Sequence, residues 1–161
     1  MDEREPMTPS GHTAMKEKLR QLKEVEMPRI SKEIGAAIAL GDLSENAEYH
    51  AAKDRQGMVA AQIRDMEDKI ARAEVIDPGK LSGTRVIFSA TVTVEDLETA
   101  ERLTYQIVGE DESDIKTNKI SFKSPLARAL IGKEEGDEVV VNTPRGRKDY
   151  EIIKVQFIPG T

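Results

Sequence analysis

Hydrophobic residues in the first half of the chain recur at the spacing of amphipathic helices. Before residue 40 they recur mostly at steps of three and four, and from residue 52 to residue 73 they keep heptad phase with charged residues between them. Two apolar stripes of matching width predict a long antiparallel two-helix coiled-coil hairpin. The positions in the stripes are Met15, Leu19, Leu22, Val25, Met27, Ile30, Ile34 and Ile38, then Ala52, Val59, Ile63, Met66, Ile70 and Ala73.

Two interruptions divide this helical half. Pro28 has no backbone N–H and coincides with a slip in the apolar phase, which predicts a kink. The bend between the two helices is expected at residues 41–46, beginning with Gly41. Each arm of about 30 residues would make a rod of roughly 45 Å, which a core of this size cannot cover. We therefore expect the hairpin to project from the rest of the protein, unless it is the coiled coil of a dimer.

The second half of the chain has the pattern of a β-sheet. β-branched residues alternate with polar ones near residues 85–94, 102–109 and 137–158, and the last of these ranges contains a turn at residues 144–146. One short helix is expected in SPLARALIG, residues 124–132, where the final glycine is a stop signal. These elements predict a sheet with one helix.

The change from the helical pattern to the sheet pattern falls at a turn-forming tripeptide, Asp77, Pro78 and Gly79. We therefore predict an α+β protein with two domains. The domains are an N-terminal coiled-coil finger, residues 1–77, and a C-terminal sheet domain, residues 78–161.

Composition and charge exclude several classes of function. The net charge of −6 gives no basic field that would draw the protein onto nucleic acid. Without cysteine, the chain has no disulfide, no thiolate nucleophile and no thiolate zinc site. The opening MDEREPM is acidic and no apolar stretch follows it, so we expect a frayed tail and neither a signal peptide nor a membrane anchor. The cytoplasm is the expected compartment.

The predicted bend has a high density of acid. In GDLSENAEYH, residues 41–50, Asp42 and Glu45 have the spacing of a capping box. In that motif the Asp42 carboxylate accepts from the first amides of the second helix, and Glu45 reaches back to the cap residue. Ser44 could cap the helix instead and would leave Asp42 free. Helix capping alone would account for the acid.

Exposed carboxylates at the end of a rod are also good metal ligands. No apolar wall removes Asp42 and Glu45 from water, so both are expected to be ionised at neutral pH, and a helix N-terminus favours the charged form. Ligation by oxygen alone fits magnesium or manganese rather than zinc or copper. Two carboxylates cannot complete an octahedron, so the bend needs a partner that supplies the other ligands.

An autonomous hydrolase is not expected. Glycosidases need a cleft and one carboxyl group of raised pKa, and the end of a rod offers neither. His12 and His50 fall in no HExxH or comparable spacing and are expected to be ordinary surface or helix histidines. Asn46 and Tyr49 lie close to the bend, where they could orient a ligand or merely be solvated.

Several long motifs occur together in one order. They are GDLSENAEYHAAK at residues 41–53, the QG of Gln56 and Gly57, VIDP at residues 75–78, YQIVGEDE at residues 105–112 and SPLARALIGKEEGDEVVV at residues 124–141. In these motifs the chain resembles the Gre family of bacterial transcript-cleavage factors, the GreA type in particular. The resemblance extends over essentially all of residues 8–158.

The resemblance implies a finger of two antiparallel helices joined to a domain of FKBP-like fold. Such factors dock at the rim of the secondary channel of RNA polymerase and insert the finger toward the active centre. There they stimulate the polymerase's intrinsic cleavage of the nascent RNA 3′ end in backtracked complexes, so the factor itself is not an enzyme. We expect a monomer whose partners are bacterial RNA polymerase and the RNA 3′ end, without a membrane partner.

The resemblance also assigns roles to residues of the bend. Asp42 and Glu45 match the pair that helps to hold the second catalytic Mg²⁺ and to orient the attacking water, while aspartates of the polymerase hold the first ion. The second ion is therefore shared and is not expected to bind this chain stably alone. Lys53 lies where the family has a basic residue thought to meet the extruded RNA, although a solvated helix charge is the alternative. Ile38 stands where relatives often have arginine, which removes a possible RNA or phosphate contact.

A further segment resembles the part of the family that docks on polymerase. It comprises Ser124, Pro125 and Leu126. The alternative is a helix start with proline in its first turn.

Three rival functions follow from the same features. A Gre-like protein could enter the secondary channel as an inhibitor without cleavage activity. An FKBP-like sheet could be a prolyl isomerase, although that chemistry needs an apolar pocket lined by aromatic residues and the chain has 3 Phe, 3 Tyr and no Trp. A coiled-coil scaffold would form a stable dimer through the helices.

Overall fold

The structure, a computed structural model, describes residues 3–161, which form two compact units. Residues 13–72 make one unit, and residues 3–12 together with residues 73–161 make the other. The chain therefore passes between the units twice, at residues 12–13 and at residues 72–73. The predicted domains divide the chain only once, after residue 77, and that division into functional modules stays a prediction.

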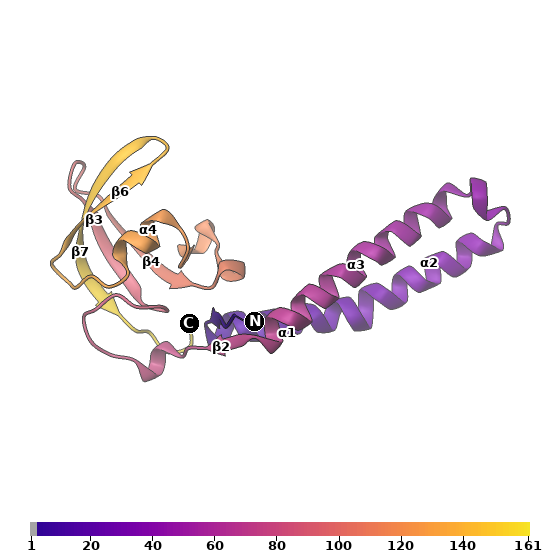
Figure 1. Ribbon diagram of the computed structural model, residues 1–161, viewed down its shortest axis with the longest axis horizontal. Helices are drawn as coiled ribbons and strands as arrows, with labels where there is room; N and C mark the ends of the chain where they lie inside the picture. The colour runs from indigo at the N-terminus through magenta and orange to yellow at the C-terminus, as the bar shows by residue number, and fades with distance from the viewer. Residues whose placement is uncertain (1–2) are drawn as a thin grey trace. The chain divides into compact units, whose positions relative to one another are not determined.

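The first half of the chain is helical, as its apolar pattern predicts (Figure 1). Helix α3 is unbroken, whereas a short π-helical turn separates α1 from α2. A 3₁₀ turn lies between α2 and α3. The elements are α1 (Pro9–Gln21), the π turn (Leu22–Glu26), α2 (Met27–Ala39), the 3₁₀ turn (Leu43–Glu45) and α3 (Ala47–Ala71).

Helices α2 and α3 lie side by side and run in opposite directions (Figure 1). Two ion pairs between the two arms give the register: Glu33 with Arg55, and Lys23 with Glu67. As the residue number falls on the first arm it rises on the second, which is the sign of antiparallel packing. Three of the side chains buried along this unit, Leu22, Ile30 and Ala52, come from the predicted stripes, whereas the buried Ala37 lies outside them. The supercoil of a true coiled coil stays a prediction.

The irregularity expected at Pro28 takes the form of the π turn. Pro28 lies in the first turn of α2, directly after the π turn, and its missing N–H cannot donate a helical hydrogen bond. Immediately before it, the N–H of Met27 donates to the carbonyl of Leu22, five residues earlier. One wide turn of this kind shifts the helical phase, which is the slip seen in the apolar pattern.

The other unit contains two sheets. A short parallel pair joins β1 (Glu5–Met7) to β2 (Ala73–Val75). The larger sheet has the strand order β5-β4-β3-β7-β6, in which only β4 and β5 are parallel. Its strands are β3 (Thr91–Asp96), β4 (Arg102–Val108), β5 (Lys119–Ser121), β6 (Glu138–Thr143) and β7 (Gly146–Gln156). The molecule is therefore α+β, which confirms the predicted class.

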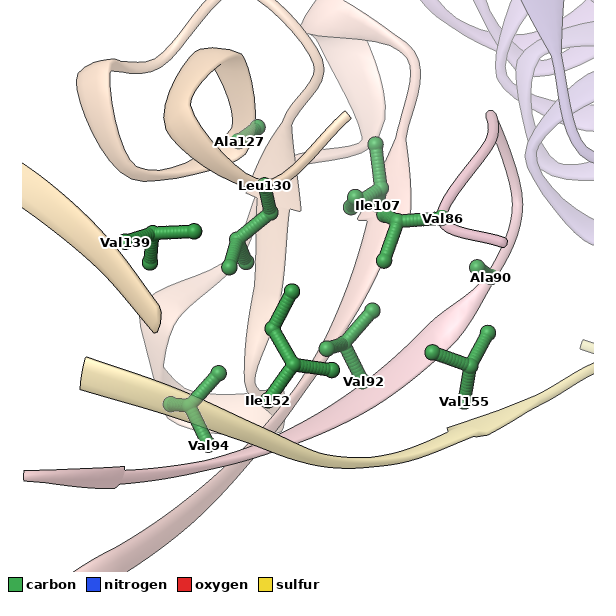
Figure 2. Close-up of a cluster of buried hydrophobic side chains, with 10 residues drawn as sticks. All are labelled: Val86, Ala90, Val92, Val94, Ile107, Ala127, Leu130, Val139, Ile152 and Val155. Carbon is green, nitrogen blue, oxygen red and sulfur yellow. The ribbon is translucent and has the colours of Figure 1, made fainter. Parts of the chain in front are cut away.

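One hydrophobic core holds the larger sheet and the short helix α4 (Pro125–Leu130) together (Figure 2). Ala127 and Leu130 of α4 face side chains of the sheet such as Ile107 and Ile152, and all four are fully buried. The core comprises Val86, Ala90, Val92, Val94, Ile107, Ala127, Leu130, Val139, Ile152 and Val155. Five aromatic side chains pack against it, as the sequence predicts: Phe88, Tyr105, Phe122, Tyr150 and Phe157.

Four expectations about local structure are wrong. The strand predicted near residues 85–94 begins at Thr91, because Ser89 has a left-handed backbone (φ 74°) that extended strands do not tolerate. Strand β5 is not in the prediction, and neither is β2, whose first residue, Ala73, is the last position of the predicted helical stripe. The segment MDEREPM was expected to fray, but residues 5–7 form β1, and residues 1–2 lie outside the described residues.

Among the helices that the structure describes, none is long and apolar enough to cross a membrane.

Candidate functional site

Helix α2 ends in a glycine turn. The N–H of Leu40 donates to the carbonyl of Ala37, and the N–H of Gly41 donates to the carbonyl of Ile38, both at 3.1 Å. Gly41 has φ +91°, the left-handed conformation in which glycine commonly follows a helix. A side chain at this position would be strained, so Gly41 fixes where the chain turns away from α2.

Asn46 begins the second helix. Its Oδ1 accepts from the N–H of Tyr49 at 3.0 Å, which is a standard N-cap contact. The capping box predicted for Asp42 and Glu45 is therefore wrong, and Ser44 is not the cap either. The physical reason is the 3₁₀ turn Leu43–Glu45, which delays the start of α3 until Ala47. Asparagine is among the strongest N-cap residues, so the signal was present in the sequence, one position before the helix.

The carboxylate of Asp42 is exposed and makes no capping hydrogen bond. Its Oδ1 accepts from the hydroxyl of Ser44 at 2.8 Å, and nothing else in residues 3–161 bonds to it. Ser44 is itself held, because its carbonyl lies 3.3 Å from Nε2 of His50. His50 therefore contacts the bend, a role that its spacing in the sequence did not indicate. One oxygen of Asp42 remains free for an external ligand.

Glu45 is exposed at the end of the 3₁₀ turn, and within residues 3–161 its carboxylate has no hydrogen bond or ion pair. Asp42 and Glu45 line the same open hollow, with a volume of about 390 Å³, whose wall is formed by residues 40–42 and 45–48. The bend therefore presents both candidate carboxylates at one surface depression.

Three apolar side chains in or next to the bend are exposed. Ile38 is 50% exposed, Leu40 is 70% exposed and Leu43 is 40% exposed. Leu40 lines the hollow with the carboxylates. Ile38, noted as a departure from the family pattern, lies near the end of α2.

The donors at the bend fit a hard cation in part. Two carboxylates with free oxygens suit Mg²⁺, which prefers oxygen ligands in a near-octahedral set. No group of three or more histidine, aspartate or glutamate side chains that could hold a metal occurs in the described part of the chain. A hard cation at the bend would therefore need further ligands from elsewhere.

The remaining predicted residues lie apart from the bend in sequence or in the other unit. Lys53 lies on α3, exposed, and its Nζ donates to Oε1 of Gln56 at 3.2 Å. Ser124 caps α4 by accepting from the N–H of Ala127 at 3.2 Å. Pro125 is exposed in the first turn of α4, whereas Leu126 is partly buried against the core. The helix-start interpretation of this segment is thus confirmed, and its docking role stays a prediction.

The fold and the bend together define a class of protein: an α+β molecule in which a turn between two long antiparallel helices presents a pair of free carboxylates. A family model described as "Transcription elongation factor, N-terminal" matches residues 5–75, and one described as "Transcription elongation factor, GreA/GreB, C-term" matches residues 81–157. The chain belongs to the GreA/GreB family of transcription elongation factors. The resemblance that the motifs indicate is confirmed.

Proteins named as members of the family are similar to this chain over nearly its whole length. "Transcription elongation factor GreA" of Hyphomonas neptunium is 56% identical over 155 residues, which cover 96% of this chain and 99% of that protein. The protein of the same name from Psychrobacter sp. is 54% identical over 156 residues, which cover 96% of this chain and 99% of that protein.

Solved structures of relatives are more distant. GreA factor homolog 1 (Gfh1) of Thermus thermophilus is 25% identical, with a TM-score of 0.43 over 95% of this chain and 99% of that one. Gfh1 of Thermus aquaticus is 26% identical, with a TM-score of 0.44 over 97% of this chain and 99% of that one.

Proposed function

We propose that this elongation factor binds bacterial RNA polymerase and stimulates cleavage of the nascent RNA 3′ end in backtracked complexes, so that elongation resumes. The observation that carries the proposal is the state of the two carboxylates at the bend. Asp42 and Glu45 line one hollow, both are exposed, and neither is used to cap a helix. An exposed pair of acids without a structural use within the chain is available to an external ligand.

Asp42 and Glu45 would each contribute carboxylate oxygen to one Mg²⁺ ion. A bound Mg²⁺ lowers the pKa of a water molecule and neutralises charge on the phosphate during in-line attack. The chain's own part would be to orient these ligands. Ser44 holds Oδ1 of Asp42, which leaves the other oxygen available to the ion, and a free oxygen of Glu45 would accept a proton from the attacking water. The water oxygen would form a bond to phosphorus as the bond from phosphorus to the 3′ oxygen breaks, and the departing 3′ oxygen would take up a proton from solvent to give the upstream RNA a new 3′ hydroxyl.

A partner must supply what the bend lacks. Mg²⁺ prefers six ligands and gives up water reluctantly, so two carboxylates hold it weakly. We propose that aspartates of the polymerase active centre supply the remaining ligands, and that the catalytic activity is intrinsic to the polymerase. The factor is then not an enzyme alone, and it works in the cytoplasm, where the polymerase is.

The two units would divide the work. We propose that the helix pair is a coiled-coil finger that enters the secondary channel, and that the FKBP-like sheet domain docks at the channel rim. Pro125, exposed at the first turn of α4, would contact the polymerase together with Ser124 and the exposed part of Leu126. Lys53, which is exposed about two helical turns beyond the bend, would meet the extruded RNA.

Two variants of the bend test this function. In a backtracked complex with Mg²⁺, the wild-type protein is expected to release short 3′ RNA fragments, whereas Asp42→Asn and Glu45→Gln each reduce the cleavage rate at least tenfold. Both residues are exposed, so binding to polymerase and thermal stability should be unchanged. Pro125→Glu is the reciprocal control: it keeps the bend but should weaken binding, and a glutamate in the first turn is compatible with the helix.

The outcomes separate this function from its rivals. If wild-type protein binds the polymerase and no fragment is released, the protein is a channel inhibitor. If both acid variants cleave at the wild-type rate, the metal role of the bend is wrong. A prolyl isomerase would accelerate isomerisation of a proline peptide, which we do not expect because the five aromatic side chains of the sheet unit pack against its core. A scaffold would sediment as a dimer.

A further inference from the structure

Asn46 contacts both helices of the pair. Its Nδ2 donates to the carbonyl of Ala37 in the last turn of α2 at 2.7 Å, and lies 3.4 Å from the carbonyl of Gly41. Its Oδ1 accepts from the N–H of Tyr49 in the first turn of α3. One partly buried amide therefore closes the bend from both sides. The donors and the acceptor of this side chain are all in use within a few residues of the carboxylates.

The backbone hydrogen bonds within the bend are long. Within it, the N–H of Glu45 lies 3.3 Å from the carbonyl of Asp42, and the N–H of Asn46 lies 3.4 Å from that of Leu43, longer than the usual 2.9–3.0 Å. Residues 41–45 are all exposed, so no packed core restrains them. Among the bonds that cross from the bend to α2, the 2.7 Å contact with Ala37 is the shortest. Asn46 is therefore the side chain that ties the bend to the end of α2.

We infer that Asn46 is a positioning residue for the carboxylates of the bend: its amide N–H groups hold the turn so that Asp42 and Glu45 address one cation. The inference rests on the proposed function. It assigns the effect to the donor half of the amide, because the acceptor half serves only the helix cap. A substitution can therefore remove the hydrogen bonds that the side chain donates and leave its capping bond in place.

Two substitutions remove the hydrogen bonds that Asn46 donates to Ala37 and Gly41 and keep its capping bond with Tyr49. Asn46→Asp leaves an oxygen for the N–H of Tyr49, and aspartate caps helices as well as asparagine does. Its carboxylate cannot donate to Ala37 or Gly41 and repels their carbonyl oxygens. Asn46→Ser also caps the helix, carries no charge and is too short to reach the end of α2. Gln62→Glu, an exposed amide-to-carboxylate change on α3, is the matched control.

The experiment measures cleavage in a backtracked polymerase complex over a range of factor concentrations and of Mg²⁺ concentrations. For Asn46→Asp and Asn46→Ser, we expect the rate at saturating factor to fall at least tenfold, while the half-saturating concentration stays within about twofold of wild type. Raising Mg²⁺ should restore part of the rate of Asn46→Ser, because a misplaced pair of ligands binds the ion more weakly. Gln62→Glu should behave as wild type. Thermal unfolding by circular dichroism checks that α3 remains folded.

The outcomes distinguish this inference from the proposed function. If Asp42→Asn abolishes cleavage but both Asn46 variants cleave at the full rate, the positioning role is wrong and the function stands. If the Asn46 variants need more factor but reach the full rate, Asn46 acts on docking, and the inference is overturned. If wild-type protein gives no cleavage, the function fails and the inference fails with it.

Discussion

Gly57 and Gly109 both lack a side chain, but their surroundings differ. Gly57 lies in the middle of α3, and a Cβ there would meet nothing within 4 Å. At Gly109, a Cβ would lie 2.7 Å from the carbonyl oxygen of Pro6 and 2.7 Å from Oε2 of Glu112. The first glycine only costs helix stability, whereas the second permits a close approach between two segments of the sheet unit.

Gly57→Ala is expected to stabilise the protein by about 1 kcal/mol, since glycine in a helix interior is less favourable than alanine by that amount. Urea unfolding followed by circular dichroism at 222 nm measures the change. A decrease in the midpoint would show that this position has a packing role that the space around it does not indicate.

Gly109→Ala is expected to destabilise the protein by about 1–3 kcal/mol, as overpacking of a tight contact does. Glu112 accepts from the N–H of Gly109 at 2.9 Å and from the N–H of the buried Thr8 at 3.1 Å, so displacing its carboxylate also unties the segment next to β1. The same urea titration measures the effect, with Gly57→Ala as the matched control. Equal midpoints for the two variants would contradict the predicted contact.

The sequence predicts the role of a single residue where that role depends only on residues next to it in the chain. Ser124 was placed at the start of a helix, and Gly41 at the bend, by local rules. Capping at the bend was assigned to Asp42 because its spacing to Glu45 fits a motif, but the 3₁₀ turn moved the helix start to the next good cap, Asn46. The contact from Asn46 to Ala37 crosses nine residues and depends on the turn geometry, so no spacing rule predicts it.

The longer elements were predictable because each carries its own periodic pattern. Helices α2 and α3 and the hairpin of β6 and β7 agree with the stripes and the alternation in the sequence. The strands of three residues, β1, β2 and β5, are too short for an alternation to be visible, and they exist because a partner strand is close by. Tertiary pairing, rather than local preference, specifies these elements.

The end of strand β3 contains a buried acid that links three segments. Asp96, 6% exposed, accepts from the N–H of Glu98 at 2.9 Å and of Thr99 at 3.3 Å, and from Nζ of Lys148 on β7 at 3.3 Å. The hydrogen bond from Glu98, together with those from Thr99 and Lys148, holds the pKa of Asp96 below its ordinary value, against the effect of burial. A group with a lowered pKa in the folded state stabilises the protein where it is ionised.

The lowered pKa of Asp96 determines how the free energy of unfolding changes with pH. The contribution of Asp96 is complete above the unfolded pKa of about 3.9 and is lost as the pH falls through the lower folded value. Asp96→Asn is therefore expected to lower the free energy of unfolding at pH 7 and to flatten its decline between about pH 5 and pH 3. Urea unfolding at several pH values measures both effects. Asp54→Asn, an exposed change on α3, is the control, and parallel curves for Asp96→Asn and wild type would contradict the assignment.

At the level of the whole molecule, we propose that the chain supplies part of a cation site and that the polymerase supplies the rest. The described residues contain no group of three or more acidic or histidine side chains placed to hold a metal, whereas Asp42 and Glu45 line one hollow, together with Glu48. Family membership places the chain among transcription elongation factors. A shared ion explains why the acid is exposed rather than built into a closed site.

The most direct test counts the bound ions. Mn²⁺, which takes the same oxygen ligands as Mg²⁺, can be followed by electron paramagnetic resonance in a backtracked polymerase complex. With the wild-type factor, we predict one more tightly bound Mn²⁺ per complex than with the Asp42→Asn/Glu45→Gln double variant, and no tight binding to the factor alone. The same number of bound ions with both proteins, at equal occupancy of the factor on polymerase, would contradict the account.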